Sequence, residues 1–374
     1  MNFIFQLQHI ELLPQDSRDA VLPLPVVTAC KDVRDLMGLS FYGESERLRY
    51  EARRKLCLAQ MLLQIDHTRL VQEGPNHKAN FENLLNEGLW KYTNQIHDIT
   101  IGFQLDPGGD RILYSTRPGP GDHLLVTDSV YGPTRRFCDL HLRRMGVTVE
   151  YYDPLAGAGI ERLFRPATRV VFTESPGSLT FEVQDVPAIA AVAHAHGARV
   201  VLDNSWATPL HFRAFDHGVD VSVHAATKYI GGHSDVLLGA IVGNEATFPA
   251  LHRLWTDMGV TASTDDCFLG LRGLRTLATR LRQQQGSGLA LAQWLRERPE
   301  VKEVLHPGLP GARGHDLWKR DFRGASSLFG VILHPVAEER IAAMLDGYEL
   351  FAMGWSWGGY ESIVIPTWPE RVRT

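Results

Sequence analysis

Two side chains capable of covalent and acid–base chemistry follow apolar, strand-like runs in the middle of the chain. Lys228 ends the run that begins at Val219, and the glycine-rich turn 231–233 (GGH) follows it. Asp203 follows the apolar run 200–202, 25 positions upstream of the lysine (228 − 203 = 25). A lysine can hold an aldehyde as a Schiff base, and a carboxylate can keep a pyridine nitrogen protonated. This pair therefore suggests pyridoxal phosphate chemistry.

Such chemistry also needs an aromatic face that stacks on the cofactor ring. Tyr131, in the string TDSVYGPTRRFC, follows another strand-like run and is the candidate. Taken singly, the three residues have ordinary explanations: a solvated turn lysine, an aspartate that starts a loop or caps a helix, and a turn tyrosine with a buried edge. Their shared position at the ends of strands favours the functional interpretation.

The elements that position these residues alternate between strand and helix from about residue 123. We expect strands at 124–126, 147–151, 169–173 and 199–202, and helices at 134–145 and 186–196. Asp185 is the expected N-cap of the second helix, and Gly197 its C-terminal stop. Short apolar strands with helical crossovers predict a parallel sheet that binds ligands beyond the carboxyl ends of its strands.

The pattern divides the chain into three regions. Residues 116–274 predict a pyridoxal phosphate-binding α/β domain, and residues 275–374, with most of the helical stretch 264–298, predict a smaller, truncated C-terminal domain. Residues 1–115 form a divergent region in which only 45–70 has the pattern of a charged helix. The predicted fold class is α/β: a mostly parallel sheet with helices on both faces, plus the smaller C-terminal α/β domain.

Composition argues against several classes of partner. The net charge of −5 gives no basic excess for nucleic acid or anionic lipid, so we expect neither a nucleic acid nor a membrane partner. The amino terminus lacks a basic segment and does not resemble a signal peptide. Four widely spaced cysteines without a CxxC motif predict reduced thiols, no metal site and a cytoplasmic location. The HxH spacing of His194 and His196 fits a helix end better than a metal site.

Several longer strings carry a resemblance to a known family. TDSVYGPTRRFCD, ESPGSLTFEVQDVPAIA, VVLDNSWATPLHF, HAATKYIGGHSDVLLG and GWSWGGYES resemble the cystathionine β-lyase branch of the Cys/Met-metabolism pyridoxal phosphate family, over roughly residues 118–374. The resemblance implies the aspartate aminotransferase-like fold type I, pyridoxal 5'-phosphate as cofactor and a homo-oligomer. The Trp-Gly-Gly motif near the end of the chain favours the β-lyase branch over the γ-lyases and γ-synthases.

The resemblance also implies roles for individual residues. Lys228 would be the Schiff-base lysine and proton shuttle, Asp203 the partner of the pyridinium nitrogen, and Tyr131 the stacking residue. Thr227 would contact the cofactor phosphate. Two residues of the SWGG string would line the site of the substrate carboxylate, Ser356 and Trp357. The implied reaction is cleavage of cystathionine, a small-molecule amino-acid thioether, to homocysteine, pyruvate and ammonia by β-elimination.

Both ends of the chain depart from the family pattern. The expected phosphate loop falls on residues 106–110 (DPGGD), whose carboxylates would repel phosphate, and the amino-terminal Tyr-x-Arg element is only faintly echoed at 41–44 (FYGE). Arg371 and Arg373 are the only late candidates for an arginine that pairs with the substrate carboxylate. The alternative hypothesis is therefore a catalytically inactive, rearranged family remnant that keeps part of the fold.

Overall fold

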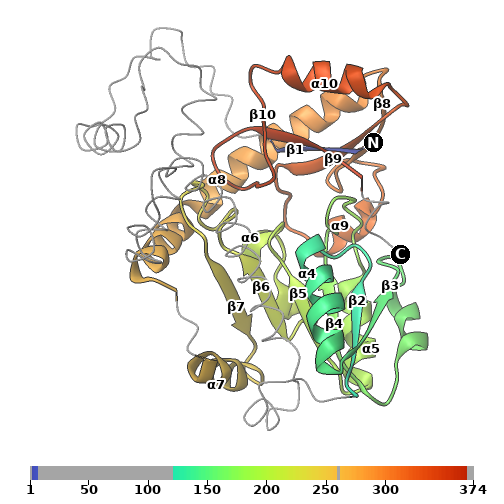
Figure 1. The fold of residues 1–374 in the computed structure, drawn as a ribbon, viewed down its shortest axis with the longest axis vertical. Coiled ribbons are helices and arrows are strands. Elements are labelled where there is room, and N and C mark those ends of the chain that lie inside the picture. Colours follow the sequence, from blue (N-terminus) through green and yellow to red (C-terminus); the bar gives the residue numbers. More distant parts are fainter. Residues whose placement is uncertain (1, 7–120, 259–261, 369–374) are drawn as a thin grey trace, which may run out of the picture. The chain divides into compact units, whose positions relative to one another are not determined.

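The computed structural model describes residues 2–6, 121–258 and 262–368, all of which belong to one compact unit (Figure 1). A six-stranded sheet has the order β3-β2-β4-β5-β6-β7, in which every pair is parallel except β6 and β7. The strands are β2 (His123–Thr127), β3 (Thr148–Tyr152), β4 (Thr168–Glu174), β5 (Arg199–Asp203), β6 (Val221–Ala225) and β7 (Gly239–Gly243).

Successive residues of a strand point to opposite faces of a sheet. In this sheet both faces carry apolar side chains, and helices cover both faces. On one face, Val171 and Leu202 pack with Ile189 of α5 (Val186–Ala195). On the other face, Phe172 and Val201 pack with the helical stretch that follows β2. That stretch consists of α4 (Gly132–Phe137), a π-helix (Cys138–Leu142) and a 3-10 turn (Arg143–Met145). The mostly parallel α/β sheet with helices on both faces is confirmed.

Local signals place α5 as the sequence predicts. The Asp185 carboxylate accepts a hydrogen bond from the Ala188 N–H at 3.2 Å, which satisfies an amide that the first helical turn leaves free. Gly197 follows the helix with a φ of +71°, a conformation that glycine adopts without a Cβ penalty. The predicted N-cap and the expected stop are both confirmed.

A second sheet has the order β10-β11-β1-β9-β8. Its strands are β1 (Asn2–Gln6), β8 (Val301–Leu305), β9 (Leu328–Leu333), β10 (Ala352–Met353) and β11 (Ile363–Thr367). β1 lies between β9 and β11 and is antiparallel to both, a pairing the sequence did not predict. The helix α8 (Thr264–Arg296) runs across the proposed boundary at 274/275. The division of the chain into three regions stays a prediction.

The remaining elements are short helices that connect the strands. They are a 3-10 segment (Gly157–Leu163), α6 (Thr208–His211), a 3-10 turn (Ala214–His217), α7 (Phe248–Met258), α9 (His315–Asp321) and α10 (Glu338–Asp346). Within the described ranges, no helix combines the length and the apolar character that a membrane crossing requires. The charged helix expected at 45–70 lies outside the described residues.

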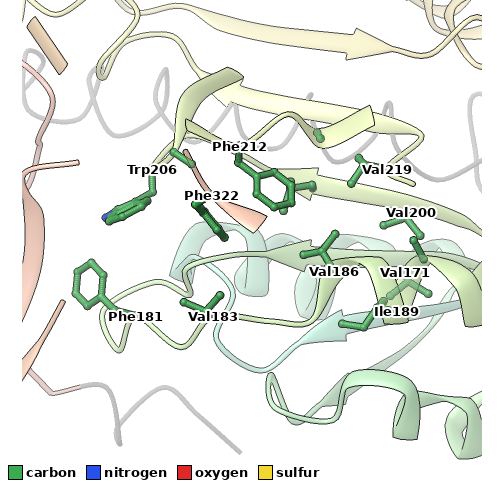
Figure 2. Packing of buried hydrophobic residues seen from close by; sticks show 14 of the residues in the cluster. Val171, Phe181, Val183, Val186, Ile189, Val200, Trp206, Phe212, Val219 and Phe322 are labelled. Carbon is green, nitrogen blue, oxygen red and sulfur yellow. The ribbon is translucent and has the colours of Figure 1, made fainter. Parts of the chain in front are cut away.

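The largest buried cluster joins the six-stranded sheet to the segment after α9. Figure 2 shows Phe212 and Phe322 side by side in this cluster, and their ring centroids lie 4.7 Å apart. Trp206, in the loop after β5, donates its indole N–H to the Leu328 carbonyl of β9 at 2.8 Å. Apolar packing and this buried hydrogen bond therefore tie the loop beyond Asp203 to the second sheet.

Replacing Ile189 with alanine should lower stability markedly. Ile189 is fully buried between α5 and the sheet, and removing a large aliphatic side chain from such a site costs about 2–5 kcal/mol. The matched control is Leu140→Ala, since Leu140 is 54% exposed on the π-helix. Thermal denaturation should show a clear fall in the unfolding temperature for Ile189→Ala only, and equal effects would contradict the packing described here.

Candidate active site

The candidate site begins where three neighbouring parallel strands end. Glu174, the last residue of β4, is paired in register with Asp203, the last residue of β5, and Asp203 is paired with Val223 of β6. Parallel strands present their carboxyl ends at the same edge of the sheet, where open α/β sheets bind ligands. The predicted position of Asp203 at a strand end is thus confirmed.

Lys228 lies in the turn that follows β6. The strand ends at Ala225, three residues earlier than the sequence run suggested, and the Lys228 N–H donates to the Ala225 carbonyl at 2.9 Å. The side chain is half-buried, and its Nζ donates to the Ser356 hydroxyl at 2.9 Å and lies 5.4 Å from the centre of the Trp357 ring. Burial lowers the pKa of Lys228 to about 8, although the Asp203 carboxylate acts in the opposite direction.

Asp203 is the last residue of β5, and its charge acts on the Lys228 amine. Its side chain is buried and accepts a hydrogen bond from the Ser205 N–H at 2.9 Å. Burial raises the pKa of the Asp203 carboxyl, while the hydrogen bonds from Ser205 and the charge of Lys228 act to lower it. The two groups influence each other's charge, so the structure brings the predicted carboxylate and the predicted lysine into one site.

Tyr131 lies at the same edge of the sheet, immediately before α4. Its N–H donates to a Glu174 carboxylate oxygen at 2.7 Å, which fixes the backbone from which the phenol projects. Burial raises the pKa of Tyr131 to about 12, and the carboxylates of Glu174 and Asp203 add to the shift. The phenol is therefore protonated at neutral pH. Its predicted role in stacking on a cofactor ring stays a prediction.

Thr227 holds the turn that carries Lys228. Its hydroxyl accepts from the Leu238 N–H at 2.8 Å and donates to the Leu238 carbonyl at 3.3 Å. The Thr227 N–H also donates to that carbonyl, at 2.9 Å. A contact between Thr227 and the cofactor phosphate stays a prediction. To donate to a phosphate, the Thr227 hydroxyl would have to give up its hydrogen bond to the Leu238 carbonyl.

The SWGG string packs directly against the Lys228 turn. Gly358 has a φ of +83°, and a Cβ at this position would lie 2.6 Å from the Lys228 carbonyl carbon and the Tyr229 nitrogen. The Ser234 hydroxyl, on the same turn, donates to the Glu361 carboxylate at 2.5 Å. Only glycine allows this close approach, which brings Ser356 and Trp357 beside Lys228 although 128 residues separate Ser356 from the lysine.

The structure adds residues that the sequence analysis did not single out. Glu174 contacts Tyr131 and could have been found by the signal that marked Asp203, a carboxylate at the end of an apolar strand. Arg280 of α8 donates to the carbonyls of Tyr229 and Ile230, and the helical pattern around it gave no such signal. Within the described part of the chain, no group of three or more His, Cys, Asp or Glu side chains is arranged to hold a metal ion.

Other predicted features fall outside the described residues. These are the expected phosphate loop at 106–110, the Tyr-x-Arg echo at 41–44, and the late arginines Arg371 and Arg373.

A half-buried lysine and a buried carboxylate at the carboxyl edge of a mostly parallel sheet are the groups that a pyridoxal phosphate-dependent protein of fold type I requires. Comparison with known proteins agrees. The chain is 53% identical over 249 residues to a candidate cystathionine β-lyase of Rhizobium johnstonii, covering 66% of this chain and 63% of that protein. It is 46% identical over 255 residues to the cystathionine β-lyase MetC of Escherichia coli, covering 67% and 65% of the two chains.

Solved structures agree with the fold. The crystal structure of cystathionine γ-lyase from Lactobacillus plantarum, complexed with L-serine, superimposes with a TM-score of 0.63 at 28% identity, covering 68% of this chain and 66% of that one. Residues 113–372 match the model of the Cys/Met metabolism PLP-dependent enzyme family, and the chain belongs to this family.

The family implies pyridoxal phosphate as the cofactor, and the described residues fit its ring. Asp203 would offer a buried carboxylate to a protonated ring nitrogen, and Lys228 would offer an amine whose pKa is lowered to about 8 by burial.

The amine of Lys228 should react at a lower pH than an ordinary lysine. In the cofactor-free protein, acetylation of Lys228 by a brief pulse of acetic anhydride, followed by peptide mass spectrometry, should rise with a midpoint near about 8. In the denatured chain the same lysine should titrate near about 10.4. In Asp203→Asn the midpoint should fall further, because the carboxylate raises the lysine pKa. Equal midpoints in folded and denatured protein would contradict the burial argument.

Proposed function

We propose that this protein is a carbon-sulfur β-lyase that converts cystathionine and one molecule of water to homocysteine, pyruvate and ammonia. The observation that carries the proposal is the environment of the Lys228 amine, which donates to the Ser356 hydroxyl at 2.9 Å and is influenced by the charge of the Asp203 carboxylate. The names of the Rhizobium and Escherichia relatives support the β-elimination. A cystathionine γ-lyase has a similar fold, and the products of turnover distinguish the two reactions.

In the proposed reaction the residues of the site bind the cofactor or substrate, stabilise a charge or transfer a proton. Bound pyridoxal phosphate supplies an electron sink for the bonds at the substrate α-carbon. Lys228 would hold the cofactor, remove the α-proton of the substrate and then protonate the departing thiolate sulfur. Its pKa of about 8 suits both steps near neutral pH. Asp203 would keep the ring nitrogen protonated, Tyr131 would stack on the ring, and Ser356 and Trp357 would line the site of the substrate carboxylate.

The proposal includes assembly and location. We infer a homo-oligomer in the cytoplasm, acting on an amino-acid thioether, with Thr227 contributing to the phosphate site. The competing hypothesis is a family member that binds the cofactor without turnover.

Lys228→Ala should abolish both cofactor absorbance and turnover. The purified protein, incubated with pyridoxal phosphate and desalted, should show the visible band of a covalently held cofactor, and the variant should lack this band. The control is Lys302→Ala, since Lys302 is an exposed lysine on β8. Cystathionine should yield pyruvate and homocysteine in the wild type and in the control, measured by chromatography.

The products separate the alternatives. Cysteine and 2-oxobutanoate in place of pyruvate would identify a γ-lyase. A Lys228-dependent band without any product would support the inactive family member. A folded wild type without the band would overturn the assignment of Lys228.

Asp203→Asn should lower turnover while the cofactor still binds. The amide cannot stabilise a positive charge on the ring nitrogen, so the rate of α-proton removal should fall on the order of 10²–10³-fold. Steady-state kinetics with cystathionine should show this fall in kcat, and an absorbance spectrum should confirm that the variant is loaded. An unchanged kcat would contradict the role of Asp203.

A further inference from the structure

We propose that Arg280 of α8 is a positioning residue that holds the turn carrying Lys228, and thereby sets where the lysine amine lies relative to Asp203. This inference rests on the proposed role of Lys228. It starts from the guanidinium, whose Nη1 donates to the Tyr229 carbonyl at 2.7 Å. Its Nη2 donates to the Ile230 carbonyl at 3.2 Å and to the Gly273 carbonyl of α8 at 2.7 Å.

The Lys228 turn leaves these carbonyls to Arg280. Within the turn, the Gly231 N–H donates to Ala226 at 2.7 Å and the Gly232 N–H donates to Lys228 at 2.8 Å. No backbone N–H of the described residues donates to the carbonyls of Tyr229 or Ile230. A buried carbonyl without a donor costs about 1–3 kcal/mol. Tyr229 is fully buried and Ile230 is half-buried, so Arg280 satisfies at least one buried acceptor that has no backbone donor.

The backbone is shaped to admit this arginine. A Cβ on Gly232, whose φ is +72°, would lie 2.0 Å from Nη1 of Arg280. A Cβ on Gly273 would lie 2.2 Å from the Ile230 carbonyl oxygen, so α8 approaches the turn at this position. The Arg280 Nε also donates to the Thr276 hydroxyl at 3.0 Å, which fixes the side chain on its own helix.

Lys228 is therefore held from two directions. Gly358 lies against the backbone of Lys228 and Tyr229, and Arg280 donates hydrogen bonds to the carbonyls of Tyr229 and Ile230. The charge of Asp203 acts on the lysine amine, whereas the hydroxyl of Ser356 that the amine contacts and the nearby ring of Trp357 are uncharged. Loosening the turn should let the amine move into solvent, so that its titration approaches that of a free lysine.

The test compares Arg280→Met and Arg280→Lys with a control, Arg282→Met, in the full chain. Arg282 is exposed on the same helix. Methionine keeps much of the apolar stem without donors, and lysine keeps the charge without the fork that reaches several carbonyls. Thermal denaturation and circular dichroism first establish which variants fold.

The first readout is the pH dependence of Lys228 acetylation in each folded protein, which requires neither cofactor nor substrate. The midpoint should move from about 8 in the wild type towards about 10.4 in Arg280→Met, with a smaller shift in Arg280→Lys. The control should match the wild type. A midpoint that stays at the wild-type value in every folded Arg280 variant would overturn the proposal.

The second readout is steady-state turnover of cystathionine by the loaded enzyme. A misplaced base should lower kcat by on the order of 10²-fold in Arg280→Met, with KM changed much less. Equal kcat values in Arg280→Met and wild type would also overturn the positioning role. If the wild type shows no turnover, the proposed reaction fails, whereas the acetylation midpoints still decide whether Arg280 positions Lys228. If Arg280→Met does not fold, Arg280→Lys carries the same comparison.

Discussion

The register of the parallel strands is the constraint on which the candidate site depends. Hydrogen bonding along the ladder places Glu174 beside Asp203, and Asp203 beside Val223, two residues before β6 ends. Because these ends are fixed by the sheet, the turn after β6 delivers Lys228 to the side on which Asp203 emerges. The sheet thereby brings Asp203 and Lys228, which are 25 positions apart in the sequence (228 − 203 = 25), to the same site. A one-residue slip would turn Asp203 to the opposite face.

Desolvation is stronger than mutual attraction in this pair. Burial lowers the pKa of Lys228 and raises the pKa of Asp203, although the charge of each partner opposes the shift. The charged form of each group is therefore less stable in the protein than it would be in water. The amine is a better base near neutral pH than an ordinary lysine, and a cationic ring nitrogen beside the carboxylate would stabilise its charged form. One physical cause would thus suit both residues to the proposed cofactor chemistry.

The sequence predicted the features that arise from local pattern. The apolar runs that became β2 to β5, the N-cap Asp185 and the position of Asp203 all follow from neighbouring residues. The antiparallel strands β1 and β7 were missed, because their place depends on partners far along the chain. The end of β6 was predicted too late. Thr227 leaves the strand and pairs with Leu238, an exchange that apolar periodicity cannot reveal.

The contacts that hold the Lys228 turn were hidden for a related reason. Arg280 acts on backbone carbonyls, which every residue possesses, so its partners have no signature in the sequence. Glycines do mark the approaches, at Gly273 and Gly358, but a glycine does not say which segment lies against it. The position of the Lys228 amine is therefore set jointly by the sheet, by α8 and by the SWGG string. A sequence can name the reacting groups, whereas their separation is a property of all three segments.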